Sequence, residues 1–470
     1  MVPDTRAIKK LKKNSQKWPN DSGLTGAKSF LLQALPEFAV LWCLRKFIVK
    51  SENGLKREPT KFFRLGNRAY GAGKFRKCDR LLRIALSLLG SNLPSEYRIL
   101  LRNSIKTTFK NSERRSEVSD SVLVATQQLQ ICLFDSTTWY QLNRGLLSLG
   151  YFRAAWVARE NSLNLSILES DIDISSGKEL RRGIEAQFER GNLECVRKLM
   201  VRAGQSIPAK TVTQIQENLV IMGTNFQQPI VEQSLTKNLG KSLFRNLVCG
   251  RTVAIVGPGE VHGDYGDEID EFDTVVRIKF ISDEMLDKEN RHGSKRDISY
   301  IGAIESVELL VAEKQVLLRN LKLILSTRTS VQNVGNVPVY SFQNEGMCYR
   351  SSSTSGLRTL LEVIRNAPAK VKVFGFDFYA TSTPYSEEMT NFYEKFSWKF
   401  GHPNDFVADG AYFRFARAHD FSNHDPVSNF CFAQNLYKAG LFDIEPYGKS
   451  ILELTPYQYV ERLEEMLGDW

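Results

Sequence analysis

The chain has 470 residues, of which 42% are hydrophobic and 25% charged, and its formal net charge is +10. This length allows two or three domains, and the apolar content is enough for hydrophobic cores, which excludes a disordered or fibrous protein. The charge is uneven, because residues 1–120 hold 26 Lys and Arg against 10 Asp and Glu, whereas the rest holds 37 against 43. A basic end predicts a partner with an anionic surface, either a membrane leaflet or a nucleic acid. A solvated face of basic helices is the alternative.

Cysteine usage and the N-terminal region bear on the compartment. The seven cysteines are odd in number, and no pair has zinc or redox spacing: Cys43, Cys78, Cys132, Cys195, Cys249, Cys348 and Cys431. We therefore expect buried thiols in a reducing, cytoplasmic compartment. The one candidate membrane span, residues 29–49, is interrupted by Glu37, Arg45 and Lys46. Because a charge inside a lipid-spanning helix costs about 3 kcal/mol, we expect an amphipathic helix and no membrane anchor or signal peptide.

Residues 1–240 show helical periodicity almost throughout, which predicts a basic all-α domain. A unit recurs at Gly73, Gly150 and Gly191, each followed by an apolar residue two positions later and a small or apolar one five positions later. The intervals of 77 and 41 residues suit helical hairpins of roughly 35 to 40 residues. This pattern is similar to tetratricopeptide-type repeats, which would offer a surface for a protein partner. An irregular helical bundle is the alternative.

One acidic pair in this half has a form associated with metal binding. Asp171 and Asp173 make an Asp-x-Asp sequence, the form with which many metal-dependent glycosyltransferases bind Mg²⁺ or Mn²⁺. The pair falls in a loop of the helical half, away from any glycine turn. We interpret it as a surface acidic turn and expect no metal site.

From about Asn246 the period changes, since short apolar runs alternate with helical patterns. The runs are residues 252–256, 274–278, 297–301, 321–325, 337–342 and 371–376, and the helical patterns are 356–366, 386–398, 426–439 and 456–466. Strands that alternate with helices imply a mostly parallel sheet covered on both faces. Residues 247–470 are therefore predicted to form a Rossmann-like α/β domain, and the fold class is α/β with an all-α domain before it.

The stretch from Val253 to Lys279 predicts the binding site. Its first apolar run ends in the turn Gly257-Pro-Gly259, where bare backbone N–H groups can approach a phosphate. Gly257, the acidic residues that follow, and Arg277 have the order and spacing of the large sialylmotif, so the stretch resembles the animal-type sialyltransferases, glycosyltransferase family 29. The resemblance implies a GT-A-like fold and a CMP-sugar donor held by Gly257, Gly259, Arg277 and Lys279.

A second stretch resembles the small sialylmotif of the same family. Ser353, Thr354, Ser355 and Gly356 open a predicted helix, and a strand ending in Phe-Gly-Phe follows. Hydroxyl groups and exposed N–H groups at a helix N-terminus suit the phosphate and carboxylate of an anionic donor. An ordinary N-cap explains the same residues.

Two further positions match family motifs. Tyr393 lies in Asn-Phe-Tyr-Glu, where the family carries a short aromatic motif whose tyrosine reaches a donor phosphate; a core aromatic residue is the alternative. His424 begins His-Asp-Pro-Val-Ser-Asn, where the family has its catalytic base before the last helix. A histidine suits proton abstraction from an acceptor hydroxyl near neutral pH. His419 is the rival base.

The sequence also departs from the family pattern. Pro258 and Lys279 replace two asparagines that hold the nucleotide, and Asn429 replaces a glutamate of the last motif. Lys279 can still hold a phosphate as a point charge. The two positions that the animal enzymes join by a disulfide are Val253 and Pro368, so that bridge cannot form here.

The resemblance, which covers about 200 residues, implies an inverting, metal-independent glycosyltransferase without a cofactor. Its donor would be CMP-sialic acid or a related CMP-activated acidic sugar such as Kdo, and its acceptor a glycan or glycolipid. A cytoplasmic enzyme peripheral to an anionic membrane would fit the basic N-terminal half. Two alternatives stay open: a non-catalytic scaffold with a decayed transferase domain, and an NADP-dependent oxidoreductase. For the latter, Gly263 comes one residue late for the GxGxxG pattern.

Overall fold

The computed structural model describes most of the chain beyond its first 90 residues. The described residues are 62, 77, 80–81, 84–85, 88, 93–110, 115–172, 177–204, 206–223, 239–279, 291–301, 321–327, 333–334, 336–344, 346–381, 386–387 and 424–467. They belong to one unit by their contacts, Thr60–Trp470. The candidate span at residues 29–49, most of the basic N-terminal segment, and Gly73 lie outside the described residues.

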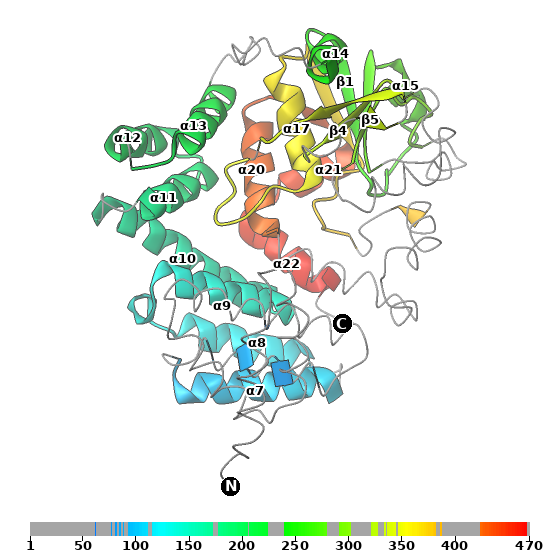
Figure 1. The fold of residues 1–470 in the computed structure, drawn as a ribbon. Helices are drawn as coiled ribbons and strands as arrows, with labels where there is room; N and C mark the ends of the chain where they lie inside the picture. Colours follow the sequence, from blue (N-terminus) through cyan, green and yellow to red (C-terminus); the bar gives the residue numbers. More distant parts are fainter. Residues whose placement is uncertain are drawn as a thin grey trace, which may run out of the picture. The chain divides into compact units, whose positions relative to one another are not determined.

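A helical half precedes the sheet, as predicted for this part of the sequence (Figure 1). Its helices are α7 (Ser95–Lys110), α8 (Arg115–Gln127), α9 (Ser136–Ser148), α10 (Phe152–Ile172), α11 (Gly177–Glu189), α12 (Leu193–Ala203) and α13 (Ala209–Met222). Gly150 and Gly191 follow α9 and α11 with φ values of 77° and 71°, a conformation in which glycine avoids the strain of a side chain. Two of the three recurring glycines therefore end helices, as the sequence predicts.

Local capping and packing explain the central hairpin of this half. Asp135 caps α9 by accepting a hydrogen bond from the Thr138 N–H at 2.7 Å. Small buried residues on α10, among them Ala155 and Ala158, let that helix approach α9 closely. The fully buried Trp139 of α9 packs edge-on against Phe134 and donates its indole N–H to the Ile131 carbonyl. Apolar burial of this kind, more than helix propensity, stabilises helices of such length.

The second half contains an eight-stranded sheet, and seven of its strands are parallel to their neighbours. The strands are β1 (Thr252–Val256), β2 (Thr274–Ile278), β3 (Ile298–Tyr300), β4 (Leu323–Ser326), β5 (Asn333–Val334), β6 (Val337–Ser341), β7 (Lys370–Phe374) and β8 (Asp443–Ile444). Their order is β5-β6-β4-β3-β2-β1-β7-β8, and among the strands of the described residues only β5 is antiparallel to its neighbour. Strands β2, β3 and β4 are buried at every position, as expected for a parallel sheet covered on both faces. The predicted α/β class and Rossmann-like parallel sheet are confirmed.

The strand order fixes where a ligand can bind. From β1 the chain proceeds to β2, β3, β4 and β6 on one side, and it reaches the other side of β1 only with β7 and β8. Val256 at the end of β1 pairs with Arg277 of β2 and with Phe374 of β7. In open α/β sheets the crevice beyond the carboxyl ends of two such strands is the usual ligand site.

The helices of this half cover the sheet and link it to the helical half. They are α14 (Leu239–Val248), α15 (Gly266–Glu271), α17 (Ser355–Arg365), α20 (Pro426–Lys438), α21 (Pro446–Leu452) and α22 (Pro456–Leu467). Ile269 of α15 packs on the face of β1 and β7 that includes Ala254 and Phe374. Helix α20 contacts α11 of the helical half, and α22 contacts α10 (Figure 1).

Several predicted strands and helices have bounds that differ from those in the structure by one or two residues, and two differences have a clear physical reason. Strand β7 ends at Phe374, two residues early, because Gly375 turns the chain with a φ of 64°. Asp171 lies in the last turn of α10, whereas the sequence placed it in a loop; Arg202 donates to its carboxylate and to its carbonyl oxygen. Asp173 lies outside the described residues. No helix among the described residues has the length and apolar character needed to cross a bilayer.

Candidate active site

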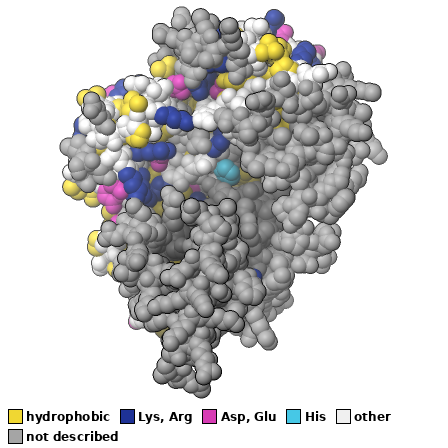
Figure 2. Space-filling view, viewed as in Figure 1, with side chains coloured by type: hydrophobic (Ala, Val, Ile, Leu, Met, Phe, Trp, Pro, Cys, Tyr) yellow, Lys and Arg dark blue, Asp and Glu magenta, His cyan; other side chains and the backbone are white. Residues whose placement is uncertain are grey.

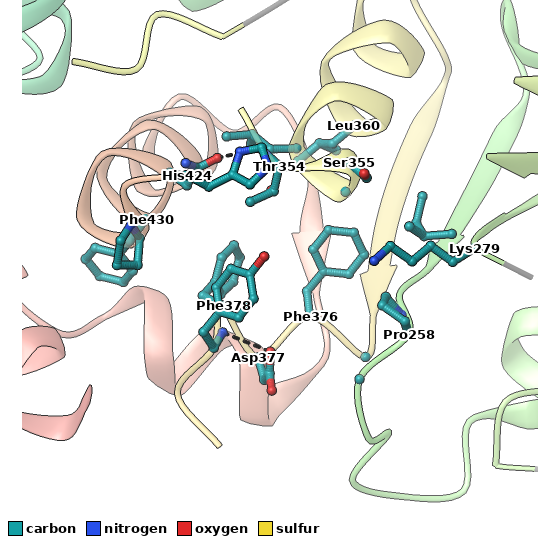
Figure 3. A pocket seen from close by; sticks show the side chains of 18 residues that line it. Pro258, Lys279, Thr354, Ser355, Leu360, Phe376, Asp377, Phe378, His424 and Phe430 are labelled. Carbon is teal, nitrogen blue, oxygen red and sulfur yellow. Dashed lines mark hydrogen bonds between the residues drawn. The ribbon is translucent and has the colours of Figure 1, made fainter. Parts of the chain in front are cut away.

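A pocket opens at the carboxyl ends of β1, β2 and β7 (Figure 3). Five segments line it: Pro258-Gly259 after β1, Ile278-Lys279 at the end of β2, residues 354–357 and Leu360 of α17, residues 375–379 after β7, and His424, Pro426, Asn429 and Phe430 at the start of α20. The pocket therefore lies at the point where the strand order reverses. Of the predicted site residues, Gly259, Lys279, Thr354, Ser355, Gly356 and His424 line it.

The glycine turn after β1 is held by the protein itself. The Gly257 N–H donates to the Phe374 carbonyl at 2.7 Å, and the Gly259 N–H donates to the Gly375 carbonyl at 3.2 Å. Pro258 has no N–H group. These hydrogen bonds join the turn to the segment after β7, so the two glycine amides are already used. The turn thus shapes the wall of the pocket, whereas the sequence argument assigned it bare N–H groups for an anion.

Two glycines, Gly257 of this turn and Gly356 of α17, make room for one aromatic ring. A Cβ atom on Gly257 would lie 2.6 Å from the Phe376 ring, and one on Gly356 would lie 2.6 Å from another carbon of that ring. Real Cβ atoms do not approach so closely, so both positions need glycine for packing. Figure 3 shows Phe376 between Pro258, Lys279 and the start of α17. The ring forms an apolar wall against which a planar group, such as a nucleobase or sugar face, can pack.

A strained turn follows Phe376. Phe378 and Tyr379 have φ values of 50° and 66°, a region that residues with side chains rarely adopt. Asp377 holds the turn by accepting hydrogen bonds from the Tyr379 N–H at 2.9 Å and from the Thr381 hydroxyl. The buried Tyr459 hydroxyl donates to the Phe378 carbonyl at 2.5 Å. Strain of this kind is concentrated at functional sites, and here three residues of the turn line the pocket.

The N-terminus of α17 forms another wall. Thr354 is the N-cap residue, and its side chain makes no capping hydrogen bond. Its backbone N–H donates to Asn429 Oδ1 at 2.7 Å. Together with Ser355 and Gly356 it brings the positive end of the helix dipole to the pocket, which favours an anionic group there. Ser353 is different, because it is buried and its hydroxyl accepts from the Gly346 N–H at 2.8 Å.

The two basic residues predicted for donor binding separate in the structure. Lys279 lines the pocket with a φ of 62°, and its side chain extends toward Phe376 (Figure 3). Arg277 is buried outside the pocket lining, and its guanidinium donates to the carbonyl oxygens of His292, Gly293 and Lys295. Arg277 therefore fixes residues 292–295 below the sheet edge, and Lys279 supplies the cationic group of the site.

His424 has its ring orientation set by a backbone carbonyl. Its Nδ1 lies 3.0 Å from the Ser352 carbonyl oxygen. A carbonyl can only accept, so Nδ1 carries the proton in the neutral ring, and the lone pair is on Nε2. The residue lines the pocket beside Thr354 (Figure 3). This tautomer is the one that a general base working through Nε2 requires.

Asn429 links the segment that holds His424 to the N-terminus of α17. Its Nδ2 donates to the Asp425 carbonyl at 2.9 Å and to the Ser352 carbonyl at 3.3 Å, the same oxygen that fixes His424. Its Oδ1 accepts from Thr354, as described above. The sequence comparison treated Asn429 only as a departure from the family pattern. In the structure it is the side chain that joins α20 to α17.

On the face that Figure 2 shows, Lys and Arg side chains of the described residues lie with Asp and Glu side chains among them and one histidine beside them.

Several site residues escaped the sequence analysis, namely Phe376, Asp377, Phe378, Tyr379 and Asn429. A signal existed for three of them, since the aromatic residues Phe376, Phe378 and Tyr379 follow a Gly at the end of a predicted strand. Tyr393 and the rival base His419 lie outside the described residues. Comparison of the chain with models of protein families, with curated proteins and with solved structures found no match.

Proposed function

We propose that the protein is an inverting, metal-independent glycosyltransferase that uses a CMP-activated acidic sugar, with His424 as the catalytic base. The observation that carries this proposal is the ring orientation of His424 at the edge of the pocket, where Nδ1 is bound to the Ser352 carbonyl and the neutral ring has its lone pair on Nε2. The resemblance to family 29 in its ordered motifs supplies the donor class, and with it the GT-A-like class of the fold.

The chemistry assigns one role to each wall of the pocket. The acceptor hydroxyl oxygen bonds to the anomeric carbon while the bond from that carbon to the CMP phosphate oxygen breaks. The hydroxyl proton passes to His424 Nε2. Lys279 and the helix terminus at Thr354 and Ser355 stabilise the charge that develops on the leaving phosphate, which is the task that a metal performs in other transferases.

The residues on the nucleotide side of the site and the basic N-terminal segment bear on the donor sugar and on where the acceptor lies. Pro258 and Lys279 change the nucleotide side of the family pattern, so the acidic sugar is sialic acid, Kdo or another acid of that type. The acceptor is a glycan or glycolipid hydroxyl. The basic N-terminal segment holds the enzyme at an anionic membrane surface, and the tetratricopeptide-like hairpins give a surface for a protein partner.

The test is CMP release from CMP-sialic acid and from CMP-Kdo by the full chain, with His424→Ala as the variant. Loss of a general base lowers turnover by about 10²- to 10⁴-fold, and the affinity for CMP stays within a few-fold. His262→Ala is the matched control, because that ring packs against Tyr447 and does not line the pocket. Undiminished turnover in His424→Ala would refute the assignment of the base.

One observation favours a second function. The amides of Gly257 and Gly259 are bound within the protein, as a scaffold with a decayed donor site would have them. A thermal shift titration with CMP, UDP and GDP separates the two readings. A selective response to CMP supports the transferase, whereas no response to any nucleotide and no turnover support the scaffold. The same glycine hydrogen bonds weigh against a dinucleotide turn, which needs those amides for pyrophosphate.

A further inference from the structure

A buried ion cluster joins the helical half to the residue that follows His424. Arg159 of α10 is fully buried, and its Nε donates to Asp425 Oδ2 at 3.0 Å. Its two other nitrogens donate to both carboxylate oxygens of Glu189 on α11, each at 2.5 Å, and Nη2 also donates to the Ser428 hydroxyl. The helical half thus holds the first turn of α20 through one guanidinium group.

The cluster has one cation and two carboxylates, and the N-terminus of α20 compensates for the excess negative charge. Burial tends to lower the pKa of Arg159, but Asp425 and Glu189 outweigh it and raise that pKa well above its usual value, so the guanidinium stays charged. Burial raises the pKa of Glu189, and the nearby Asp425 carboxylate adds to this effect, although Arg159 opposes it. Asp425 is the N-cap of α20 and accepts from the Val427 and Ser428 amides, so the positive end of that helix supplies the remaining charge.

A second contact holds the carbonyl to which His424 is bound. Arg350, in the loop before α17, reaches into the helical half, where its guanidinium donates to the hydroxyl groups of Ser136 and Thr137 on α9. Tyr349 beside it is fully buried, and its hydroxyl lies 2.7 Å from Ser162 Oγ on α10. The chain then passes to Ser351 and Ser352, and the Ser351 hydroxyl accepts from the Asp425 N–H at 2.6 Å.

We propose that Arg159 and Glu189 are positioning residues of the transferase site, so that the helical half sets the tautomer and orientation of the His424 ring. The hydrogen bond of His424 to Ser352 has an anchor on each side. Arg159 fixes Asp425, next to the histidine, and Arg350 fixes the loop that carries the accepting carbonyl. This inference rests on the proposed function for its kinetic consequence only, because the orientation of the ring can be measured without turnover.

The first readout is the ¹⁵N spectrum of the full chain labelled at histidine, with the His424 signals assigned by their loss in His424→Ala. In the wild type, we expect the neutral His424 ring to have its proton on Nδ1. In the double variant Arg159→Met/Glu189→Gln, which removes one charge of each sign, we expect the signals of both tautomers. The variant Asp425→Asn keeps an N-cap oxygen and loses the ion pair, so it tests the same link with less risk to folding.

The second readout is kinetic. A misplaced base lowers kcat by about 10- to 100-fold, whereas the Km for the CMP-sugar changes by less than about 3-fold, since the phosphate walls are untouched. We expect Arg159→Lys, which restores the cation, to recover part of this loss. The matched control is Arg365→Met/Glu217→Gln, which removes another ion pair between the two halves, at the far end of α17. That control should leave both the His424 signals and kcat unchanged.

The outcomes separate the two proposals. Unchanged His424 signals in both Asp425→Asn and the double variant, with circular dichroism like that of the wild type, would overturn the positioning role. Equal losses in the Arg365 control would also overturn it, because they would show a general loosening of the two halves. If the wild type turns over no CMP-sugar but the tautomer signals change as expected, the proposed function fails and the positioning role stands.

Discussion

Gly356 is the second residue of α17, a place where alanine is ordinarily the better residue by up to about 1 kcal/mol. Here we expect the opposite sign. A Cβ atom would lie 2.6 and 2.8 Å from two carbons of the Phe376 ring, which is packed on the other side by Gly257. Gly356→Ala should therefore lower the melting temperature and weaken the thermal shift with CMP. Ser355→Ala, one residue earlier, should leave the melting temperature nearly unchanged.

A compensating change gives a stricter test of this explanation. The double variant Gly356→Ala/Phe376→Leu replaces the ring by a smaller side chain and so removes the clash. Part of the stability lost in Gly356→Ala should therefore return. If Gly356→Ala alone raises the melting temperature, the ring moves at no cost and the packing explanation is wrong.

The strained turn after β7 depends on one hydroxyl group. Tyr459 donates to the Phe378 carbonyl, and burial raises the pKa of its hydroxyl well above the usual value. Tyr459→Phe should destabilise the protein by about 1 kcal/mol, because the carbonyl loses its donor in a buried position. Chemical denaturation measures this difference. Tyr457→Phe is the control, since that ring is 37% exposed on the same helix, and an equal loss there would contradict the role of the buried bond.

At the scale of elements, α15 is tied to the segment before β3 by one carboxylate. Asp270 accepts hydrogen bonds from the backbone N–H groups of Ser294 and Lys295. Burial raises the pKa of Asp270, but these amides outweigh it, and the net pKa is below the usual value. A lowered pKa in the folded state means that the stabilisation is complete above the pKa of the unfolded chain, and is lost as the pH falls through the folded value.

We therefore expect Asp270→Asn to lower the melting temperature at neutral pH. The difference from the wild type should shrink once the pH falls below about 4, where the unfolded aspartate is protonated. Scanning calorimetry at several pH values measures this. A difference that stays constant down to pH 2 would show that the carboxylate charge contributes nothing. Asp267→Asn, on an exposed position of the same helix, is the control.

The sequence predicted the bounds of a strand best where the strand is a short apolar run between two turns. The bounds of β1 and β2 match the prediction residue for residue, because each is a short buried apolar run between turns. Strand β8 has two residues, too few for any pattern, and exists because it pairs with β7. Asp171 was misplaced since an acidic pair reads as a turn, whereas Arg202 from another helix stabilises it inside α10.

For the site, the sequence identified chemistry better than position. His424, Lys279 and the start of α17 were named from their residue types and do line the pocket. Arg277 and Ser353 were named by the same reasoning but are buried among partners that lie many residues away. No local pattern shows that an arginine on a helix such as Arg159 is fully buried, because its burial comes from Asp425 and Glu189, far along the chain.

At the scale of the molecule, the two halves share buried charges and should unfold together. The inter-half contacts of Arg159 and Arg350 are absent from a chain limited to the α/β half. Leaving a buried charge without its partner costs about 3 to 5 kcal/mol, a large part of the stability of an ordinary protein. We expect residues 239–470 alone, which keep α14, to be insoluble or to lack a cooperative transition.

The comparison for that prediction is a chain that begins at Thr60 and keeps both halves. It should show one melting transition, with circular dichroism and tryptophan fluorescence in agreement. A soluble fragment of residues 239–470 that unfolds cooperatively would contradict the prediction and would show that the α/β half is stable by itself.

The bond between Arg159 and Asp425 also sets an order of events during synthesis. The two residues are 266 positions apart. At about 5 to 20 residues per second, the ribosome adds Arg159 roughly 13 to 53 seconds before it reaches Asp425. For most of that interval the nascent helical half has the Glu189 partner of its arginine but not the α20 partner. The segment from Asp425 onward therefore completes the core of a helical half made long before it, and chaperones have that interval in which to bind it.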